Sequence, residues 1–277
     1  MTDYRFILTN VTDHIAHITL NRPEYRNGQA TELLHELDHA ILAAGADTDV
    51  RVIVLTGAGD HFSAGHDLGT PAEQAYRAAN PMEPGMRGFF DRTWRLYVDM
   101  HLRWRNVPTP MIAAVQGYCI FGGWMIASTA DIVYAADDAM FLGSLFQYFS
   151  IPWDIHPRRA KEMLFQGKFI NGAQAKELGL VNRVLPRADL LDAVMEYARD
   201  VAQNDPMQMR LVKLAINQVQ DQQGFTASIQ GSHAHYMLNW QAERDPNFAL
   251  TVPEGKRRPM VQVALDRYKR DQARTKT

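Results

Sequence analysis

The sequence predicts an α/β core followed by an all-helical C-terminal region. Two continuous apolar runs, at residues 51–55 and 110–115, are typical of strands that are buried on both faces of a sheet. Helical patterns lie between these runs, and a strand–helix–strand order favours a parallel crossover unit. We therefore predict a core domain at residues 1–186 and a helical region at 187–277. Beyond Pro186 the predicted helices are 187–204, 206–222, about 224–243 and 259–272.

Composition excludes several classes of function. The chain has 277 residues, of which 46% are hydrophobic and 22% charged, so it can bury a large globular core. Its net charge of −2 gives no electrostatic case for nucleic acid, and no apolar run reaches the ~20 residues that a membrane span needs. The lone Cys119 excludes an internal disulfide and fits a reducing compartment, so we expect a cytoplasmic location. His233 and His235 have no further ligand pattern beside them, so we expect no metal site.

The N-terminal part of the chain alternates strands and helices. Residues 4–9 and 14–20 alternate apolar and polar side chains, which predicts two strands around a turn at 10–13. A loop at 21–28 follows, broken by proline and glycine. Thr31 is the expected N-cap of a helix whose apolar residues recur at helical spacing.

A glycine-rich segment, TGAGDHFSAGHDLGT at residues 56–70, follows the buried strand at 51–55. It predicts a loop at the strand end where open α/β sheets bind ligands. It is not a dinucleotide fingerprint, because no third glycine stands at the required spacing and no helical pattern follows at once. Residues 70–90 are weakly patterned, so we expect a mobile loop beside the site. A helix is expected at 89–104.

A second glycine segment, QGYCIFGGWMIASTAD at residues 116–131, follows the buried strand at 110–115. Gly122 and Gly123 open a stretch with helical patterning. Backbone N–H groups at a helix start lack intrahelical partners and, with the helix dipole, suit a ligand oxygen that carries negative charge. The alternative is a tight turn that uses two glycines. Two such loops can each point one N–H at a shared atom, and two donors make an oxyanion hole for a reacting carbonyl.

The remaining elements are short, and no sequence repeat stands out. Glycines that follow helical patterns predict where two of the helices end. We predict strands at 131–135, 139–142 and 180–184, an aromatic-rich loop at 146–153, and helices at 158–166 and 171–178 followed by Gly167 and Gly179.

Four motifs in a specific order and spacing carry a family resemblance. They are NRPEYRN at 21–27, RVIVLTGAGDHFSAGHDL at 51–68, PMIAAVQGYCIFGGWMIASTADIVYA at 110–135 and AKELGLVNRVLP at 175–186. On these motifs the chain resembles the crotonase family, also called enoyl-CoA hydratase/isomerase. The resemblance implies a spiral ββα superhelix core and acyl-CoA thioesters as substrates. Coenzyme A then enters as part of the substrate rather than as a cofactor, and the implied assembly is a homotrimer or a dimer of trimers formed through the helical C-terminal region.

The resemblance also implies the position of the site. It puts the two oxyanion-hole donors on the backbone N–H groups of His66 and Gly122. Glu24 and Arg26 fall where the family's first loop touches coenzyme A, and Asp67 is expected to hold its loop rather than to react. The other residues expected to line the substrate pocket are Ala64, Gly65, Leu68, Tyr118, Phe121, Trp124, Met125 and Leu145.

The chain departs from the family at the residues that move protons. Family hydratases carry two glutamates that activate and protonate water. These positions fall on Met125 and Leu145, and neither side chain can transfer a proton. Phe121 replaces the first glycine of the family's usual triplet. The ordinary two-glutamate hydration is therefore not expected, and a missing general base usually lowers a rate by ~10²–10⁴-fold.

Asp154 is the candidate replacement base. Some members of the family, including its 4-chlorobenzoyl-CoA dehalogenases, have a working aspartate at the matching point of this loop. A carboxylate between Trp153 and Ile155 would have its pKa raised by desolvation, as a base near neutral pH requires. The alternative is structural, in which Asp154 caps the following helix or pairs with Arg158 or Arg159.

The nearby histidines have simpler explanations than catalysis. The family needs only the N–H of His66, so its side chain is expected to be tolerated, and His101 on an aromatic helical face is expected to be packed. Two functions stay open. One is an acyl-CoA enzyme that catalyses hydration, a double-bond shift, hydrolysis or C–C cleavage. The other is an acyl-CoA binding protein that keeps the fold without activity.

Overall fold

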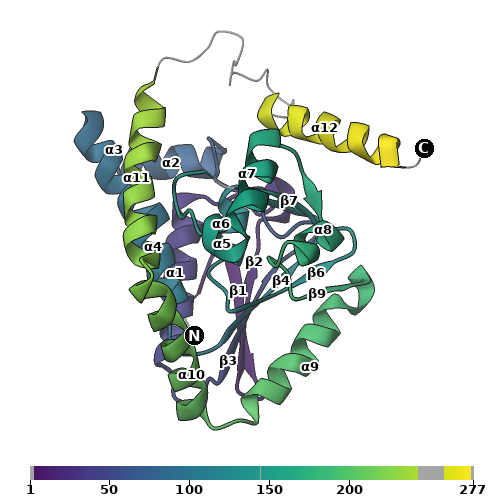
Figure 1. Ribbon diagram of the computed structural model, residues 1–277. Helices are drawn as coiled ribbons and strands as arrows, with labels where there is room; N and C mark the ends of the chain where they lie inside the picture. Colours follow the sequence, from purple (N-terminus) through teal and green to yellow (C-terminus); the bar gives the residue numbers. More distant parts are fainter. Residues whose placement is uncertain (1–2, 144, 243–258, 276–277) are drawn as a thin grey trace.

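A six-stranded sheet forms the centre of the computed structural model, which describes residues 3–143, 145–242 and 259–275 (Figure 1). Its strand order is β1-β2-β3-β4-β6-β9. The β1–β2 pair is antiparallel and every other neighbouring pair of this sheet is parallel, as crossover units require. The bounds are β1 Ile7–Thr12, β2 Ile15–Leu20, β3 Val52–Gly57, β4 Met111–Val115, β6 Ile132–Ala136 and β9 Arg183–Leu185.

The first strand pair turns later than the sequence predicts. Strand β1 runs through the expected turn at 10–13, and the chain reverses at Asp13 and His14, whose φ angles are 51° and 65°. Positive φ at both central residues matches the twist of a two-residue hairpin turn. The strand predicted at 180–184 is also shifted, because β9 begins only at Arg183.

A smaller sheet has the order β5-β7-β8. Strand β7 (Met140–Leu142) matches the strand predicted at 139–142. Strands β5 (Tyr118–Ile120) and β8 (Ile170–Asn171) were not predicted, because three and two residues are too few to show a period. Helix α5 (Gly122–Ala127) follows β5, so the strand that leads into the double glycine is β5 rather than β4.

Helix α1 (Thr31–Ala46) forms where the spacing predicts it, but its start differs. Ala30 is the N-cap residue, and the backbone N–H and hydroxyl of Thr31 both donate to the Glu73 carboxylate, at 2.7 and 2.9 Å. The prediction of a Thr31 cap is therefore wrong. A buried carboxylate from a distant segment satisfies the helix start instead.

The loop predicted at residues 70–90 is largely helical. Its first helix is capped by Thr70, whose hydroxyl accepts from the N–H of Glu73, and Pro71 stands in the first turn. These capping signals outweigh the weak apolar pattern on which the loop prediction rests. The segment contains α2 (Pro71–Ala79) and the first part of α3 (Gly85–Thr93). The helix predicted at 89–104 forms as the rest of α3, the π-helical turn η2 (Trp94–Asp99) and α4 (Met100–Arg105).

The described chain beyond Pro186 is helical, as predicted. Its helices are η3 (Arg187–Asp189), α9 (Leu190–Ala202), α10 (Pro206–Gln222), α11 (Phe225–Gln241) and α12 (Pro259–Thr275), and the short helices before them are η1 (Pro23–Tyr25), α6 (Ile151–Asp154), α7 (Pro157–Gln166) and α8 (Gly172–Glu177). Helix α9 packs on one face of the main sheet, with Leu190 and Val194 against Val54 and Ile112. Helices α10 and α11 run along the flank beside α3 and α4 (Figure 1). Among the helices described, none is long and apolar enough to cross a membrane.

Candidate active site

The two glycine segments meet beyond the carboxyl ends of β3 and β4. The N–H of Phe62 donates to the Gln116 carbonyl at 2.8 Å, and the N–H of Ser63 donates to the Tyr118 carbonyl at 2.9 Å. The N–H of Ile120 returns a bond to the Ser63 carbonyl at 3.0 Å. The segments are therefore paired like short strands, and the pairing ends just before the two expected donor positions.

Glycine is required where the segments touch. A Cβ atom at Gly65, whose φ is 88°, would lie 2.7 Å from the Ile120 carbonyl oxygen and 3.2 Å from the Gly122 nitrogen. A Cβ atom at Gly122 would lie 2.4 Å from Gln29 Oε1 and 2.8 Å from His66 Nδ1. Side chains at these positions would push the segments apart. The absence of side chains lets positions 66 and 122 lie side by side.

The backbone N–H groups of His66 and Gly122 are both available as donors. Gln29 pairs with the neighbours of His66, since its N–H donates to the Gly65 carbonyl and its carbonyl accepts from Asp67. The N–H of His66 therefore points away from Gln29. Gly122 is the first residue of α5, where an N–H has no intrahelical acceptor. Within the described residues, neither N–H donates a hydrogen bond.

The His66 side chain is held by specific partners. Its Nδ1 lies 3.0 Å from Gln29 Oε1, and its Nε2 lies 2.8 Å from Gln147 Oε1. The Tyr97 ring stacks on it, with ring centroids 4.1 Å apart. Burial lowers the pKa of His66 to about 4, although the Gln147 contact and the Glu73 charge oppose the shift. The imidazole is therefore neutral near pH 7.

Both ring nitrogens of His66 face an amide oxygen, Gln29 Oε1 and Gln147 Oε1. A neutral imidazole donates one hydrogen bond and accepts one, so it donates to only one of these two oxygens. The two amides hold the ring from both sides, whichever nitrogen carries the proton.

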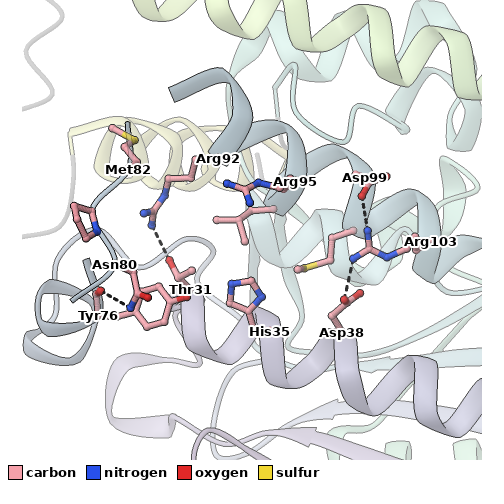
Figure 2. Close-up of a pocket in the computed structure, with 13 residues that line it drawn as sticks. Thr31, His35, Asp38, Tyr76, Asn80, Met82, Arg92, Arg95, Asp99 and Arg103 are labelled. Atoms are coloured by element: carbon pink, nitrogen blue, oxygen red, sulfur yellow. Dashed lines mark hydrogen bonds and ion pairs between the residues drawn. The ribbon is translucent and has the colours of Figure 1, made fainter. Parts of the chain in front are cut away.

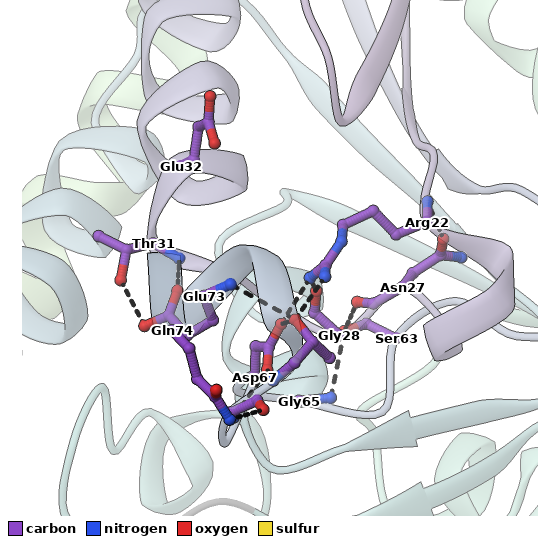
Figure 3. A network of polar contacts seen from close by, with 12 residues as sticks. Arg22, Asn27, Gly28, Thr31, Glu32, Ser63, Gly65, Asp67, Glu73 and Gln74 are labelled. Atoms are coloured by element: carbon purple, nitrogen blue, oxygen red, sulfur yellow. Dashed lines mark hydrogen bonds and ion pairs between the residues drawn. The ribbon is translucent and has the colours of Figure 1, made fainter. Parts of the chain in front are cut away.

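A buried ion pair holds the first loop in place (Figure 3). Arg22 Nη1 lies 2.9 Å from Asp67 Oδ2, and each side chain is 1% exposed. Asp67 also accepts from the N–H groups of Gly69 and Thr70, at 3.0 and 2.8 Å. Burial alone would raise the pKa of Asp67, but the hydrogen bonds from Thr70, Gly69 and Arg22 hold it below its ordinary value. These contacts give Asp67 a structural role.

Phe121 adopts backbone angles that favour glycine. Its φ and ψ are 46° and −103° at the residue that precedes α5. A bulky residue in such a region costs of order 1–3 kcal/mol and persists only where the surroundings enforce it. The N–H of Phe121 donates to the Leu142 carbonyl at 2.9 Å, and its ring packs on the cluster that contains Leu142 and Phe169.

Beyond Gly122 lies a wall of buried, mainly apolar side chains, which includes Trp124, Met125 and Tyr148. Met125 is fully buried, one turn along α5, in a cluster with Tyr148 and Phe225. Trp124 is 1% exposed and packs against Phe141, and its indole N–H has no acceptor among the described residues. Leu145 lies at the surface, where 39% of it is exposed. Neither Met125 nor Leu145 supplies a group that transfers protons.

Two polar side chains stand unpaired in this wall. Within the described chain, the hydroxyl of Tyr148 and both ring nitrogens of His101 lack a hydrogen bond of standard geometry, although the Leu96 backbone lies close enough to His101 to oppose the lowering of its pKa. Their rings lie 5.5 Å apart, and the Trp104 ring lies 4.6 Å from His101, so His101 is packed as predicted. Burial lowers the pKa of His101 to about 3 and raises that of Tyr148, so both are neutral near pH 7. Unpaired buried polar groups are uncommon and destabilising.

Asp154 lies in α6, and its carboxylate accepts from Ser150 Oγ at 2.6 Å. Desolvation raises the pKa of Asp154 to about 6, against the opposing effects of the Ser150 and Ser128 hydroxyls and the Arg105 charge. The residue lines a cavity of about 360 Å³ that also contacts α10 and the first residues of β4 and β6. A carboxylate that ionises near pH 6 is suited to accept a proton at neutral pH.

The structural roles considered for Asp154 are not formed. The N-cap of α7 is His156, whose ring accepts from the N–H of Arg158. Arg159 pairs with Glu162 at 3.3 Å, and among the described ion pairs none joins Asp154 to either arginine. The pKa of Asp154 is therefore raised by desolvation, and the hydroxyl groups beside it offset only part of that rise.

The residues expected to contact coenzyme A are exposed or half-buried around the first of the two glycine segments. Glu24 and Arg26 are exposed at η1, Leu68 is 57% exposed, and Ala64 is half-buried. Tyr118 is half-buried and stacks on His61, with centroids 4.5 Å apart. These side chains are accessible to a ligand that approaches the two loops from solvent.

Three residues near the donors were not identified from the sequence. Gln29, Gln147 and Tyr97 all contact His66, and they come from a loop end, an irregular segment and η2. No spacing rule joins them, because only the fold brings them together. In the described part of the chain, no group of three or more His, Cys, Asp or Glu side chains is arranged to hold a metal ion.

Known proteins share this arrangement of elements. The family model described as Enoyl-CoA hydratase/isomerase matches residues 10–245. A probable enoyl-CoA hydratase from Mycobacterium smegmatis is similar in structure, with 41% identity, a TM-score of 0.77, and coverage of 84% of this chain and 93% of that chain. An enoyl-CoA hydratase/isomerase from Xanthobacter autotrophicus Py2 has 29% identity, a TM-score of 0.77, and coverage of 99% and 96%. The enoyl-CoA hydratase EchA19 of Mycobacterium tuberculosis is 31% identical over 222 residues, which are 75% of this chain and 78% of that protein.

The chain therefore belongs to the enoyl-CoA hydratase/isomerase family. The crotonase fold implied by the sequence motifs is confirmed, with a helical C-terminal part. Its function is accordingly of the enoyl-CoA hydratase/isomerase type, and an acyl-CoA thioester is the consistent class of substrate.

Proposed function

We propose that the protein polarises an acyl-CoA thioester carbonyl between the backbone N–H groups of His66 and Gly122. The observation that carries this proposal is the contact between the two glycine segments at Gly65 and Gly122, which sets two unused donors side by side. Donors fixed by the fold need no rearrangement when charge develops on the substrate oxygen. The neutral His66 ring and its amide partners keep the first donor in position.

The proposed base is Asp154. Its pKa of about 6 leaves it ionised near pH 7 and still basic enough to take a proton. Asp154 lies beside Ser128, which follows α5 directly. Because a six-residue helix is about 9 Å long, Asp154 lies well beyond the carbonyl position at the start of α5. Asp154 is therefore expected to act on an acyl atom several bonds from the thioester, or through Tyr148, whose pKa its charge raises further.

A second candidate is an acyl-CoA binding protein without catalytic activity. Met125 and Leu145 favour it, because they stand where family hydratases carry their glutamates and neither can move a proton. Binding at the two donors would survive this change, since it needs only backbone groups.

The proposal includes self-association through the helical region. Helix α10 exposes apolar residues on two of its sides, and exposed apolar surface can mark an interaction surface. Its most exposed apolar residues, 47–60% exposed, are Met207, Leu211, Val212, Leu214, Ile216 and Val219. Sedimentation velocity should give the mass of a trimer or of a dimer of trimers, and a monomer would contradict this part.

Turnover and binding of a panel of enoyl- and aroyl-CoA thioesters test the two candidates. An active enzyme should turn over at least one thioester, and Asp154→Asn should lower turnover by about 10²–10⁴-fold while leaving binding intact. Binding of several thioesters without turnover of any would support the inactive binding protein. No binding of any acyl-CoA would contradict both.

A further inference from the structure

A cavity of about 470 Å³ lies between α1, α2 and the continuous helix formed by α3, η2 and α4 (Figure 2). Neither His66 nor Gly122 lines it, so it is separate from the two donor loops. Figure 2 shows its polar walls, with Thr31, His35 and Asp38 on α1 and Arg92, Arg95 and Arg103 on the opposite side.

The carboxylates near this cavity are already engaged. Arg103 Nη2 lies 2.8 Å from Asp38 Oδ2, and the same guanidinium also pairs with Asp99. Glu73 does not line the cavity, and its carboxylate accepts from Arg92 at 3.1 Å and from Arg77 at 2.6 Å. The acidic groups therefore neutralise Arg103 and, in part, Arg92.

Arg95 has no acidic partner in the described chain. Its Nε donates to the Asp91 carbonyl one turn earlier, at 3.2 Å, and its two Nη groups donate to no described acceptor. His35 lies across the cavity. Burial lowers the pKa of His35, and the charges of Arg95, Arg92 and Arg103 lower it further against the pull of Asp38. The cavity is therefore electropositive on the side of Arg95.

We propose that this cavity binds a small organic anion, whose oxygen atoms are held by Arg95 and Arg92. A guanidinium group presents a planar fork of donors that matches a carboxylate or phosphate. The rest of the cavity offers apolar contacts from Met82, Leu96 and Met100, which suit a short hydrocarbon part. A ligand with both features would fill the space better than a simple ion.

Occupancy should reach the loop of the proposed oxyanion hole by two direct routes. Turn η2 carries Arg95 at the cavity and, two residues on, Tyr97, which stacks on His66 at 4.1 Å. π-helical turns are frequent at functional sites. Arg92 is linked through Glu73 to Arg77, whose Nη2 donates to the Asp67 carbonyl at 3.3 Å.

Calorimetry on the intact protein at constant ionic strength tests the binding site. Sodium hexanoate is the carboxylate probe with an apolar part, and inorganic phosphate is the probe without one. Hexanoate should bind saturably, and Arg95→Gln should weaken it by about tenfold or more. Arg87→Gln is the matched control, since Arg87 is 80% exposed, pairs only weakly with Glu83 at 3.9 Å and lies outside the cavity.

No saturable binding of hexanoate, or equal binding by the two variants, would overturn the proposal. Phosphate binding that depends on Arg95 without any hexanoate binding would overturn the assignment of an organic ligand. Hydrogen exchange of residues 63–70 should change on saturation with hexanoate in the wild type, and an unchanged pattern would overturn the link to the loop. Neither measurement uses turnover, so both are independent of the proposed catalytic activity.

Discussion

The loop that carries His66 and the wall beyond Gly122 are built in opposite ways. In the loop, the carboxylate of Asp67 is paired with Arg22 and with backbone N–H groups, and the His66 ring has an amide at each nitrogen. In the wall, His101 and Tyr148 are as deeply buried but lack a well-formed hydrogen bond within the described residues. The side chains of the loop are therefore paired without a ligand, and only the backbone N–H of His66 is left as a donor, whereas the wall contains side-chain polar groups that only a ligand or water would satisfy.

The same contrast separates the family motifs from the departures. The quoted motifs cover both glycine segments, whose backbone positions the fold fixes. The residues that differ from the family's proton-transfer set, Met125 and Leu145, and the candidate base Asp154 belong to the wall or to the segment behind it. The backbone frame can thus be kept while the chemistry of the wall changes.

The largest expected effect is on the candidate base. Asp154→Asn should lower kcat by about 10²–10⁴-fold, because the amide keeps the shape but cannot accept a proton. In the wild type, kcat/KM should rise as the pH passes through the pKa of about 6, since the ionised carboxylate is the active form. Asp192→Asn, on the exposed first turn of α9, is the matched control and should leave the rate unchanged. A variant of Asp154 with full activity would refute its role.

The same substitution should affect stability in a pH-dependent way. The pKa of Asp154 is raised in the folded state, so the folded protein holds this proton more tightly than the unfolded chain. The free energy of unfolding therefore falls as the pH rises from about 4 to about 6, by at most about 3 kcal/mol. Asp154→Asn should be more stable than the wild type at neutral pH but not at about pH 4. Urea denaturation at both pH values checks this, and an equal difference at both would contradict it.

Breaking the ion pair of the loop should cost nearly as much. Asp67→Asn leaves the buried Arg22 without its charge partner, which should lower the free energy of unfolding by about 3–5 kcal/mol. Asp60→Asn is a control in the same loop, because Asp60 is 88% exposed and pairs with Arg187 at the surface. Its effect should stay within about 0.5 kcal/mol. Similar losses for both variants in urea denaturation would show that the loop is not held by the buried pair.

The second donor should be sensitive to a single methyl group. Gly122→Ala would push against Gln29 and His66 and displace the donor. The activation free energy should rise by about 2.7–4 kcal/mol, which lowers kcat. Gly231→Ala on the exposed face of α11 meets nothing within 4 Å. This control should keep the rate and gain about 0.5–1 kcal/mol of stability. If both variants kept full activity, position 122 would not supply a donor.

The smallest effect is expected in the unpaired wall. His101→Phe keeps a planar ring against Tyr148 and Trp104 and removes two buried nitrogens that lack a well-formed hydrogen bond, so it should stabilise the fold by about 1–2 kcal/mol. The pKa of His101 is lowered to about 3 in the folded state, so the wild type loses further stability as the pH falls below 6.5 and the unfolded chain takes up the proton. Thermal melts across this range check the difference, and a less stable variant would indicate that His101 has a partner.

The sequence predicts the parts of the fold that local pattern determines. Strand β4 (Met111–Val115) forms within the run predicted at 110–115, because a continuous apolar run is typical of a strand buried on both faces of a parallel sheet. Helix α2 was missed although Thr70, Pro71 and Glu73 carry a start signal, because its apolar pattern is weak. β5 was missed because three residues show no period.

The candidate site was predictable only where it depends on the backbone. Glycines mark the positions of close approach, and they are visible in the sequence. Gln29 and Gln147 are not, because each becomes important only through its contact with His66, from segments 37 and 81 residues away. The environment of Asp154 likewise depends on Ser150, Ser128 and Arg105, which the fold collects from three elements.

The central claim is that two main-chain donors share one carbonyl oxygen. A crystal structure with a non-hydrolysable acyl-CoA analogue tests it most directly. The analogue's carbonyl oxygen should lie about 2.7–3.1 Å from the backbone nitrogens of both His66 and Gly122. An oxygen beyond hydrogen-bond reach of either nitrogen, in a complex with the analogue fully bound, would contradict it.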